Sequence, residues 1–131
     1  MQLSPEKRGE ISGLLTRLSL SFNFLNQEKD AQWLLPFGDE KEPYVLVVKC
    51  SEISLQVVCD AMKAPEESAA LRSLLELNGQ ISWARAAIVG ERVFIWSDVD
   101  VNLLGIESLR AAVFSVSDGI LRLRKSLASR G

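Results

Sequence analysis

Histidine is absent from this sequence of 131 residues. Its absence excludes catalytic triads that use a histidine base and metal sites with imidazole ligands. An excess of charge of one sign is also missing, because 15 basic and 17 acidic side chains leave a formal net charge of −2. Non-specific binding to DNA or RNA needs many phosphate contacts from Lys and Arg, so we expect no nucleic-acid partner.

Long hydrophobic runs are missing as well. No stretch approaches the roughly 20 apolar residues that span a bilayer, so we expect no membrane segment. The polar segment Met1–Glu10 does not begin the apolar core of a signal peptide. The eight glycines are scattered and form no phosphate-binding motif, which predicts a chain without a cofactor.

Cysteine is scarce, with only Cys50 and Cys59. The surrounding pattern predicts a β-hairpin of Tyr44–Cys50 and Ile53–Asp60, joined by a two-residue turn. That turn separates the two cysteines by roughly 20 Å at about 3.3 Å per residue. A disulfide needs Cα atoms within about 7 Å, so we expect two reduced, buried thiols and a cytoplasmic location.

Hydrophobic periodicity predicts three helices and five strands in one domain that covers residues 1–131. The expected helices begin near Pro5, Pro65 and Ile106, and they end before Asn26, at Asn78–Gly79 and near Ser126. The expected strands are Gln32–Phe37, Tyr44–Cys50, Ile53–Asp60, Ser82–Val89 and Arg92–Val99. The order α-β-β-β-α-β-β-α indicates an α+β fold with a single antiparallel sheet of about five strands.

Alternation along the first hairpin separates a core face from an outer face. One side is almost wholly apolar and holds Tyr44, Leu46, Val48, Cys50, Ile53, Leu55, Val57 and Cys59. The outer side is mixed and carries Val45 and Val47, with Val45 expected directly opposite Val58. Polar residues such as Lys49 complete that side.

In the second hairpin, Arg85 decides the orientation because an unpaired buried guanidinium is very costly. The inner side then holds Ala84, Ala86, Ile88, Val93, Ile95 and Val99, and the outer side holds Trp83, Arg85, Phe94, Trp96 and Asp98. Trp96 is expected opposite Arg85, in position for a cation–π contact. A bulge at Gly90 is the alternative, and it would turn Phe94 and Trp96 inward.

One segment resembles a known group of proteins. Leu77-Asn78-Gly79-Gln80-Ile81-Ser82-Trp83-Ala84-Arg85-Ala86-Ala87-Ile88 is similar to the L-N-G-x-L-x-x-A-R-F-A-L segment of YbjN-type proteins, which share the fold of type III secretion chaperones such as the Tir chaperone. The chain departs from that pattern at Ala86, where Phe is usual, and in its short turn at Gly90. A family of uncharacterised cyanobacterial proteins with the same fold also fits.

The resemblance implies a small α+β domain that binds proteins, tends to dimerise and has no catalytic residues. The sequence adds a candidate surface, because two long helices are expected on one sheet face and a short helix of about 15 Å cannot cover the other. We therefore predict a partner-binding patch on the outer face, formed by Trp83, Arg85, Phe94, Trp96, Val45 and Val47.

The main prediction is a non-enzymatic, chaperone- or adaptor-like protein that forms a homodimer. A regulator that holds a small apolar molecule between the sheet and the short helix, beside Trp83, is the alternative. A third hypothesis uses Asp98 and Asp100 as a carboxylate pair in a hydrolase. We disfavour it, because no third polar partner accompanies the two carboxylates.

Overall fold

The computed structural model describes residues 4–22, 27–29, 32–38, 41–51, 53–79 and 83–128. Its elements are α1 (Pro5–Phe22), β1 (Gln27–Lys29), β2 (Gln32–Phe37), β3 (Tyr44–Cys50), β4 (Ser54–Lys63), α2 (Ser68–Asn78), β5 (Arg85–Val89), β6 (Arg92–Asp100), the 3-10 helix η1 (Val101–Leu103) and α3 (Ile106–Ala128). The predicted α+β order is confirmed. The three-residue strand β1 is an addition, in a polar stretch that carries no strand pattern.

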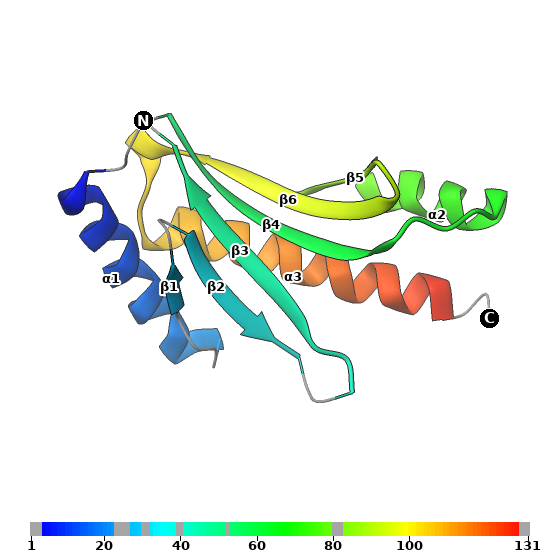
Figure 1. Cartoon of the computed structure of the whole chain (residues 1–131), viewed down its shortest axis with the longest axis horizontal. Helices are drawn as coiled ribbons and strands as arrows, with labels where there is room; N and C mark the ends of the chain where they lie inside the picture. The colour runs from blue at the N-terminus through cyan, green and yellow to red at the C-terminus, as the bar shows by residue number, and fades with distance from the viewer. Residues whose placement is uncertain are drawn as a thin grey trace.

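The strands form one antiparallel sheet in the order β1-β2-β3-β4-β6-β5 (Figure 1). The long strands β4 and β6 lie side by side in its middle. Their register shifts between Asp60 and Met62, so that β4 carries one residue more than its partner at Ala61. This β-bulge lies in β4, and not at Gly90 as the alternative reading of the sequence had it.

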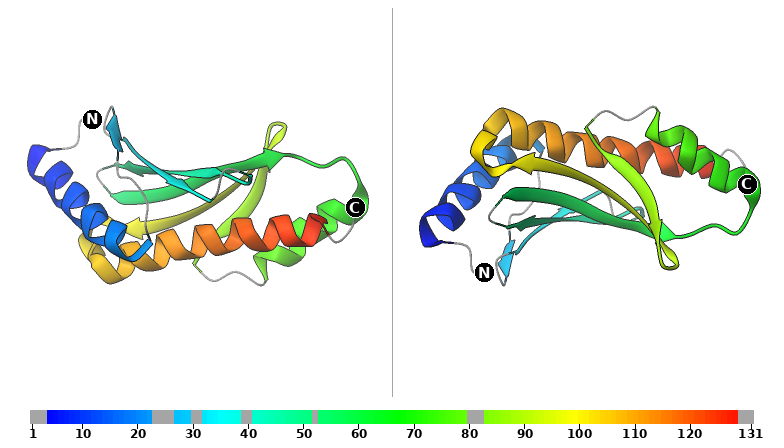
Figure 2. Two further views of the ribbon diagram at one scale, coloured as in Figure 1. Left: turned by 90° about the horizontal axis from the view of Figure 1, so that it is seen from below. Right: turned by 90° about the horizontal axis from the view of Figure 1, so that it is seen from above.

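All three helices lie on one side of the sheet (Figure 2). The two long helices α1 and α3 were expected there, but α2 was expected on the opposite side. The structure corrects that placement: α2 packs beside α3 and against β5, and its buried Leu74 and Leu77 belong to the common core. No helix of the described residues therefore covers the other side, which we call the outer face.

The core fills the space between the helices and the inner face of the sheet. Its fully buried side chains include Ile11, Leu15 and Leu18 from α1, Trp33 and Leu35 from β2, Leu46, Leu55 and Ile95 from the middle strands, and Leu109, Val113, Val116 and Ile120 from α3. The Trp33 indole also donates a hydrogen bond of 2.9 Å to the Ser12 hydroxyl, which fastens α1 to β2.

Helix α1 begins at Pro5, as predicted, and the Ser4 hydroxyl caps it by accepting a 3.2 Å hydrogen bond from the Lys7 amide. The predicted end of this helix, just before Asn26, lies outside the described residues. On α2, Leu74 is buried, whereas the neighbouring Leu75 is 75% exposed. Gly79 ends α2 in a right-handed conformation with φ −83°.

Arg124 fastens α3 to the connection between β2 and β3. Its guanidinium donates hydrogen bonds of 2.8 Å to the Glu42 carbonyl and 3.1 Å to the Pro43 carbonyl, and lies 5.3 Å from the centre of the Tyr44 ring. Gly38 bends the same connection with φ +83°, and a Cβ there would clash with the Glu42 carbonyl oxygen.

The first hairpin has a longer connection than the sequence suggested. Cys50 pairs with Leu55 and not with Ile53, because the Ser51 amide donates to the Ser54 carbonyl at 2.8 Å. The register therefore moves by two residues, which leaves every side chain of the strands on its predicted face. Ile53, expected in the core, lies in the connection and is 79% exposed.

The second hairpin has the predicted pairing. Arg85 stands opposite Trp96, and Ala87 opposite Phe94, with no bulge between them. Gly90 has φ +62°, as the first position of a type II′ turn requires. Ile88, expected in the core, is 44% exposed, because β5 lies at the edge of the sheet.

Candidate functional site

A row of large apolar side chains crosses the outer face from strand to strand. Leu34 on β2 pairs with Val47 on β3, Val47 with Val58 on β4, and Val58 with Trp96 on β6. We call these four residues the apolar row. Each is half-buried, although no described helix covers it.

The row ends at Arg85 on β5, which pairs with Trp96. Five strands thus contribute to one line across the sheet. At about 4.8 Å between neighbouring strands, the line is about 19 Å long.

A polar row borders the apolar row on one side. It consists of Gln32, Lys49, Gln56 and Asp98, which pair in that order across β2, β3, β4 and β6. The Gln56 amide donates a hydrogen bond of 3.4 Å to the Asp98 carboxylate. The face is therefore amphipathic, with a defined boundary between its apolar and polar parts.

A mixed row borders the apolar row on the other side. Phe94 on β6 is half-buried and stands between Asp60 and Ala87. Val45 on β3 is 45% exposed and pairs with Pro36, so it does not face Val58 as predicted. The Arg92 guanidinium and the Asp60 carboxylate form an ion pair of 2.8 Å.

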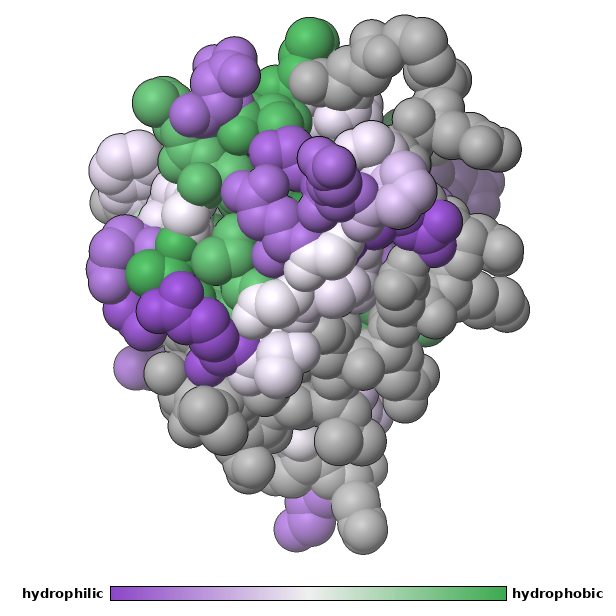
Figure 3. All heavy atoms as spheres, turned by 90° about the vertical axis from the view of Figure 1, so that its left-hand side faces the viewer, coloured by the Kyte–Doolittle hydropathy of each residue, from purple (hydrophilic) through white to green (hydrophobic). Residues whose placement is uncertain are grey.

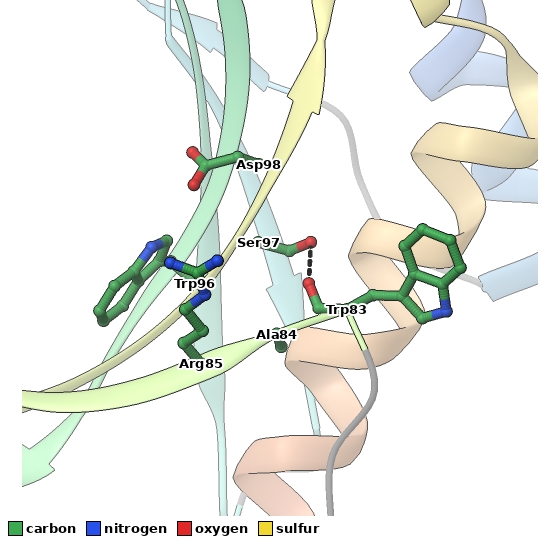
Figure 4. Close-up of a pocket in the computed structure, with 6 residues that line it drawn as sticks. All are labelled: Trp83, Ala84, Arg85, Trp96, Ser97 and Asp98. Carbon is green, nitrogen blue, oxygen red and sulfur yellow. Dashed lines mark hydrogen bonds between the residues drawn. The ribbon is translucent and has the colours of Figure 1, made fainter. Parts of the chain in front are cut away.

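Arg85 and Trp96 project from the same side of the sheet (Figure 4). The cation–π contact predicted between them is not formed; in the described part of the chain, such a contact occurs at Arg124 and Tyr44. Arg85 has no ion-pair partner among the described residues, which leaves a cation at the end of the apolar row.

Trp83 does not stand where the sequence placed it. Strand β5 begins at Arg85, and Trp83 precedes it in a bend with φ +69°, a conformation that is rare for a bulky side chain. The Ser97 hydroxyl donates a hydrogen bond to the Trp83 carbonyl, and the indole points away from Trp96 (Figure 4). Trp83 is 79% exposed but does not belong to the apolar row.

Other apolar surface is less continuous. Ile53 and Leu103, 79% and 73% exposed, lie where the β3–β4 connection meets η1, and the Val101 amide donates to the Ile53 carbonyl at 3.1 Å. Figure 3 shows this end of the molecule, where hydrophilic side chains interrupt the hydrophobic surface.

A groove of about 390 Å³ runs between α2 and the edge strand β5. It is lined by Leu71, Leu74, Leu75, Asn78, Ala86, Ala87 and Ile88. The hollow beside Trp83, about 330 Å³, is lined instead by Arg85, Trp96 and Asp98 among others. The apolar groove between sheet and short helix exists, therefore, but not beside Trp83.

The carboxylates proposed for a hydrolase are both exposed and engaged locally. Asp98 accepts from Gln56, and Asp100 accepts a 2.8 Å hydrogen bond from the Asn102 amide, which caps η1. Asp98 lines the hollow beside Trp83, but Asp100 does not, so that hollow does not enclose the carboxylate pair that acid–base catalysis would need.

The cysteines are free, as predicted, but only Cys59 is buried; Cys50, also expected to be buried, is half-buried. Burial raises the pKa of Cys59 to about 11 and also raises the pKa of the half-buried Cys50, so both are neutral thiols at pH 7. Within the residues that the structure describes, no three Cys, Asp or Glu side chains gather to hold a metal ion. In the same part of the chain, no helix is long and apolar enough to cross a bilayer.

Sequence reasoning missed Leu34 as a member of the row. The signal was present in β2, because Trp33 and Leu35 are the core residues and the residue between them must face outward. Val58 was assigned to the correct face but to the wrong partner.

No family model and no curated protein matches this sequence. Solved structures match it by fold. The Yersinia pestis type III secretion chaperone SycH, in complex with a stable fragment of YscM2, gives a TM-score of 0.60 at 19% identity over 86% of this chain and 98% of that chain. A chain of the ExoU–SpcU complex from the type III secretion system of Pseudomonas aeruginosa gives 0.62 at 18% identity, over 86% and 93%.

A chain of the HopA1–SchA chaperone–effector complex gives a TM-score of 0.63 at 12% identity, over 94% of this chain and 99% of that chain. The protein therefore has the fold of type III secretion chaperones. At these identities the likeness shows the fold alone. It bears out the fold that the resemblance noted in the sequence implied.

Proposed function

We propose that this protein binds another protein through the outer face of its sheet, as a non-enzymatic, chaperone- or adaptor-like module. One observation carries the proposal: all three helices lie on the opposite side and leave the apolar row uncovered. Apolar surface that is gathered in one place and bordered by polar residues marks interaction sites. The fold neighbours support it, since SycH and SchA were solved in complexes with proteins.

The dimensions of the outer face suit a segment of a partner. The row and its two neighbouring rows cover about 19 Å by about 13 Å, or roughly 250 Å². Stable complexes between whole proteins bury about 800 Å² per partner. A helix of about 13 residues spans 19 Å at 1.5 Å per residue, so an amphipathic helix matches the length of the row.

Because the outer face suits a short segment, we propose that a second copy of the chain binds at another surface. The homodimer uses the end of the molecule formed by α2 and β5. Leu75 and Ile88 are 75% and 44% exposed there, beside the apolar groove. Light scattering of the wild type and of Leu75→Glu tests this, with a monomeric wild type as the contradicting result. Membership of the YbjN-type group and a cytoplasmic location, which two free cysteines favour, are parts of the same proposal.

Affinity capture from the native lysate tests the outer face. We expect Trp96→Ser and Val47→Ser each to lose the same captured protein, because both remove apolar area from the row. Leu121→Ser is the matched control: Leu121 is 53% exposed on α3, on the helical side. Unfolding in urea confirms that all three variants are folded. A captured protein that survives both row variants, or that Leu121→Ser also loses, contradicts the proposal.

The groove between α2 and β5 supports a second candidate function, binding of a small apolar molecule. Its volume of about 390 Å³ falls within the range of ligand sites, and most of its lining is apolar. Native mass spectrometry of the protein as isolated should then detect a bound molecule that Ile88→Asp abolishes. A protein free of any adduct would remove this candidate.

A further inference from the structure

Strand β5 is an edge strand, because it stands last in the order β1-β2-β3-β4-β6-β5 and has β6 as its neighbour in the sheet. An edge strand exposes backbone amides and carbonyls that attract strands from other molecules. In an antiparallel pair, alternate residues turn both of these groups toward the partner strand, and the residues between them turn theirs away. The groups that point away from β6 determine whether another strand can join.

The backbone amide and carbonyl of Ala86 point away from β6, and the side chain of Asn78 is hydrogen-bonded to both of them. The Ala86 amide donates a 2.7 Å hydrogen bond to Asn78 Oδ1, and Asn78 Nδ2 donates a 2.9 Å hydrogen bond to the Ala86 carbonyl. These are the two bonds that a residue of a neighbouring strand would make. Asparagine can make both because its planar amide presents a donor and an acceptor together, as a peptide group does.

Helix α2 holds this amide in place. Asn78 is the last residue of the helix, and the Gly79 amide closes the helix end with a 3.0 Å hydrogen bond to the Glu76 carbonyl. The preceding Leu77 is only 3% exposed and anchors this turn of the helix in the core. The Asn78 side chain thus joins the end of α2 to β5 across eight residues of sequence.

We propose that Asn78 closes the β5 edge to strand addition and so determines how partners bind at this end of the molecule. The backbone groups of Ala86 are already hydrogen-bonded to Asn78. Because alternate residues face away from β6, Ile88 is then the remaining residue of β5 whose backbone groups point away from that strand. One residue is too short to pair with a strand. A second copy of the chain, which the proposed homodimer places at this end, must therefore use side chains in the apolar groove, which Asn78 itself lines.

Hydrogen exchange of the Ala86 amide tests the bond directly. We expect Asn78→Ala to exchange this amide about tenfold faster than the wild type, while the Ala87 amide, which faces β6, is unchanged. Asn78→Asp is the matched variant of equal size: it keeps the acceptor for the Ala86 amide and should keep its protection. Equal exchange of Ala86 in wild type and Asn78→Ala overturns the proposal.

A synthetic peptide with the sequence of residues 84–90 tests the closure of the edge. We expect it to bind labelled Asn78→Ala with shifts centred on Ala86, and to bind the wild type at least tenfold more weakly, because the wild type must first break two hydrogen bonds. The same peptide methylated at its Ala86 nitrogen should not bind either protein. Equal binding to both proteins, or no binding to the variant, overturns the closure.

Two further variants keep the result decisive. Asn78→Ser, whose hydroxyl is too short to reach both groups of Ala86, replaces Asn78→Ala should that variant fail to fold. Trp96→Ser should leave both measurements at their wild-type values, because Trp96 lies on the outer face. Failure of the edge closure and failure of client binding on the outer face are thus distinguishable.

Discussion

Trp33 provides the sharpest test of how α1 is attached to the sheet. Its side chain is 0% exposed, and its indole N–H donates to the Ser12 hydroxyl across 21 residues of sequence. Trp33→Phe removes the pyrrole ring and the donor but keeps a ring in place. The lost burial amounts to about 1.6 kcal/mol, at about 0.8 kcal/mol per methylene-sized group. Loss of the hydrogen bond adds about 1 kcal/mol.

Trp33→Phe should therefore lower the free energy of unfolding by about 2.5 kcal/mol, measured in urea. For 131 residues this corresponds to a fall in Tm of about 9 °C. A double-mutant cycle with Ser12→Ala should give a coupling energy of about 1 kcal/mol. Trp83→Phe is the control, and its effect should stay within about 0.5 kcal/mol because Trp83 is 79% exposed. A small effect of Trp33→Phe, together with no coupling to Ser12, would refute the docking of α1 on β2.

Two further predictions concern the core and the connections. The raised pKa of Cys59, about 11 against 9.0 in an unfolded chain, means that the unfolded chain releases this proton first as the pH rises. Stability should be complete below pH 9 and fall by on the order of 2 kcal/mol toward pH 11, and urea titrations of Cys59→Ala should lack this step. Gly38→Ala should cost several kcal/mol, because its Cβ meets the Glu42 oxygen, whereas Gly90→Ala should cost about 1–2 kcal/mol for its positive φ alone. Equal Tm values for the two glycine variants would contradict the clash.

The faces of the strands were predictable because their periodicity does not depend on the exact pairing. The first hairpin is shifted by two residues from its predicted register, yet Val47 still faces outward and Val48 inward. The orientation of the second hairpin was predictable from the cost of burying a charge. Because Arg85 must face outward, Phe94 and Trp96 on the paired strand face outward as well. Local patterns of this kind are read directly from the sequence.

The features that were missed depend on the tertiary structure. The position of α2 is set by packing against α3 and β5, and its own stripe of leucines does not reveal which sheet face it covers. The bend at Trp83 reflects a positive φ that no sequence rule assigns to tryptophan. Strand β1 consists of polar residues that pair with β2 through the backbone, so it carries no hydrophobic signal.

The extra residue at the bulge of β4 also bears on how the sequence can change. Ala61 has no partner on β6, whereas Asp60 and Met62 on either side of it do. Deletion of one residue from a regular strand would move every later side chain of that strand to the opposite face of the sheet. Loss of the codon for Ala61 would leave every paired side chain on its present side, so β4 can become shorter at this point without turning its core residues into solvent.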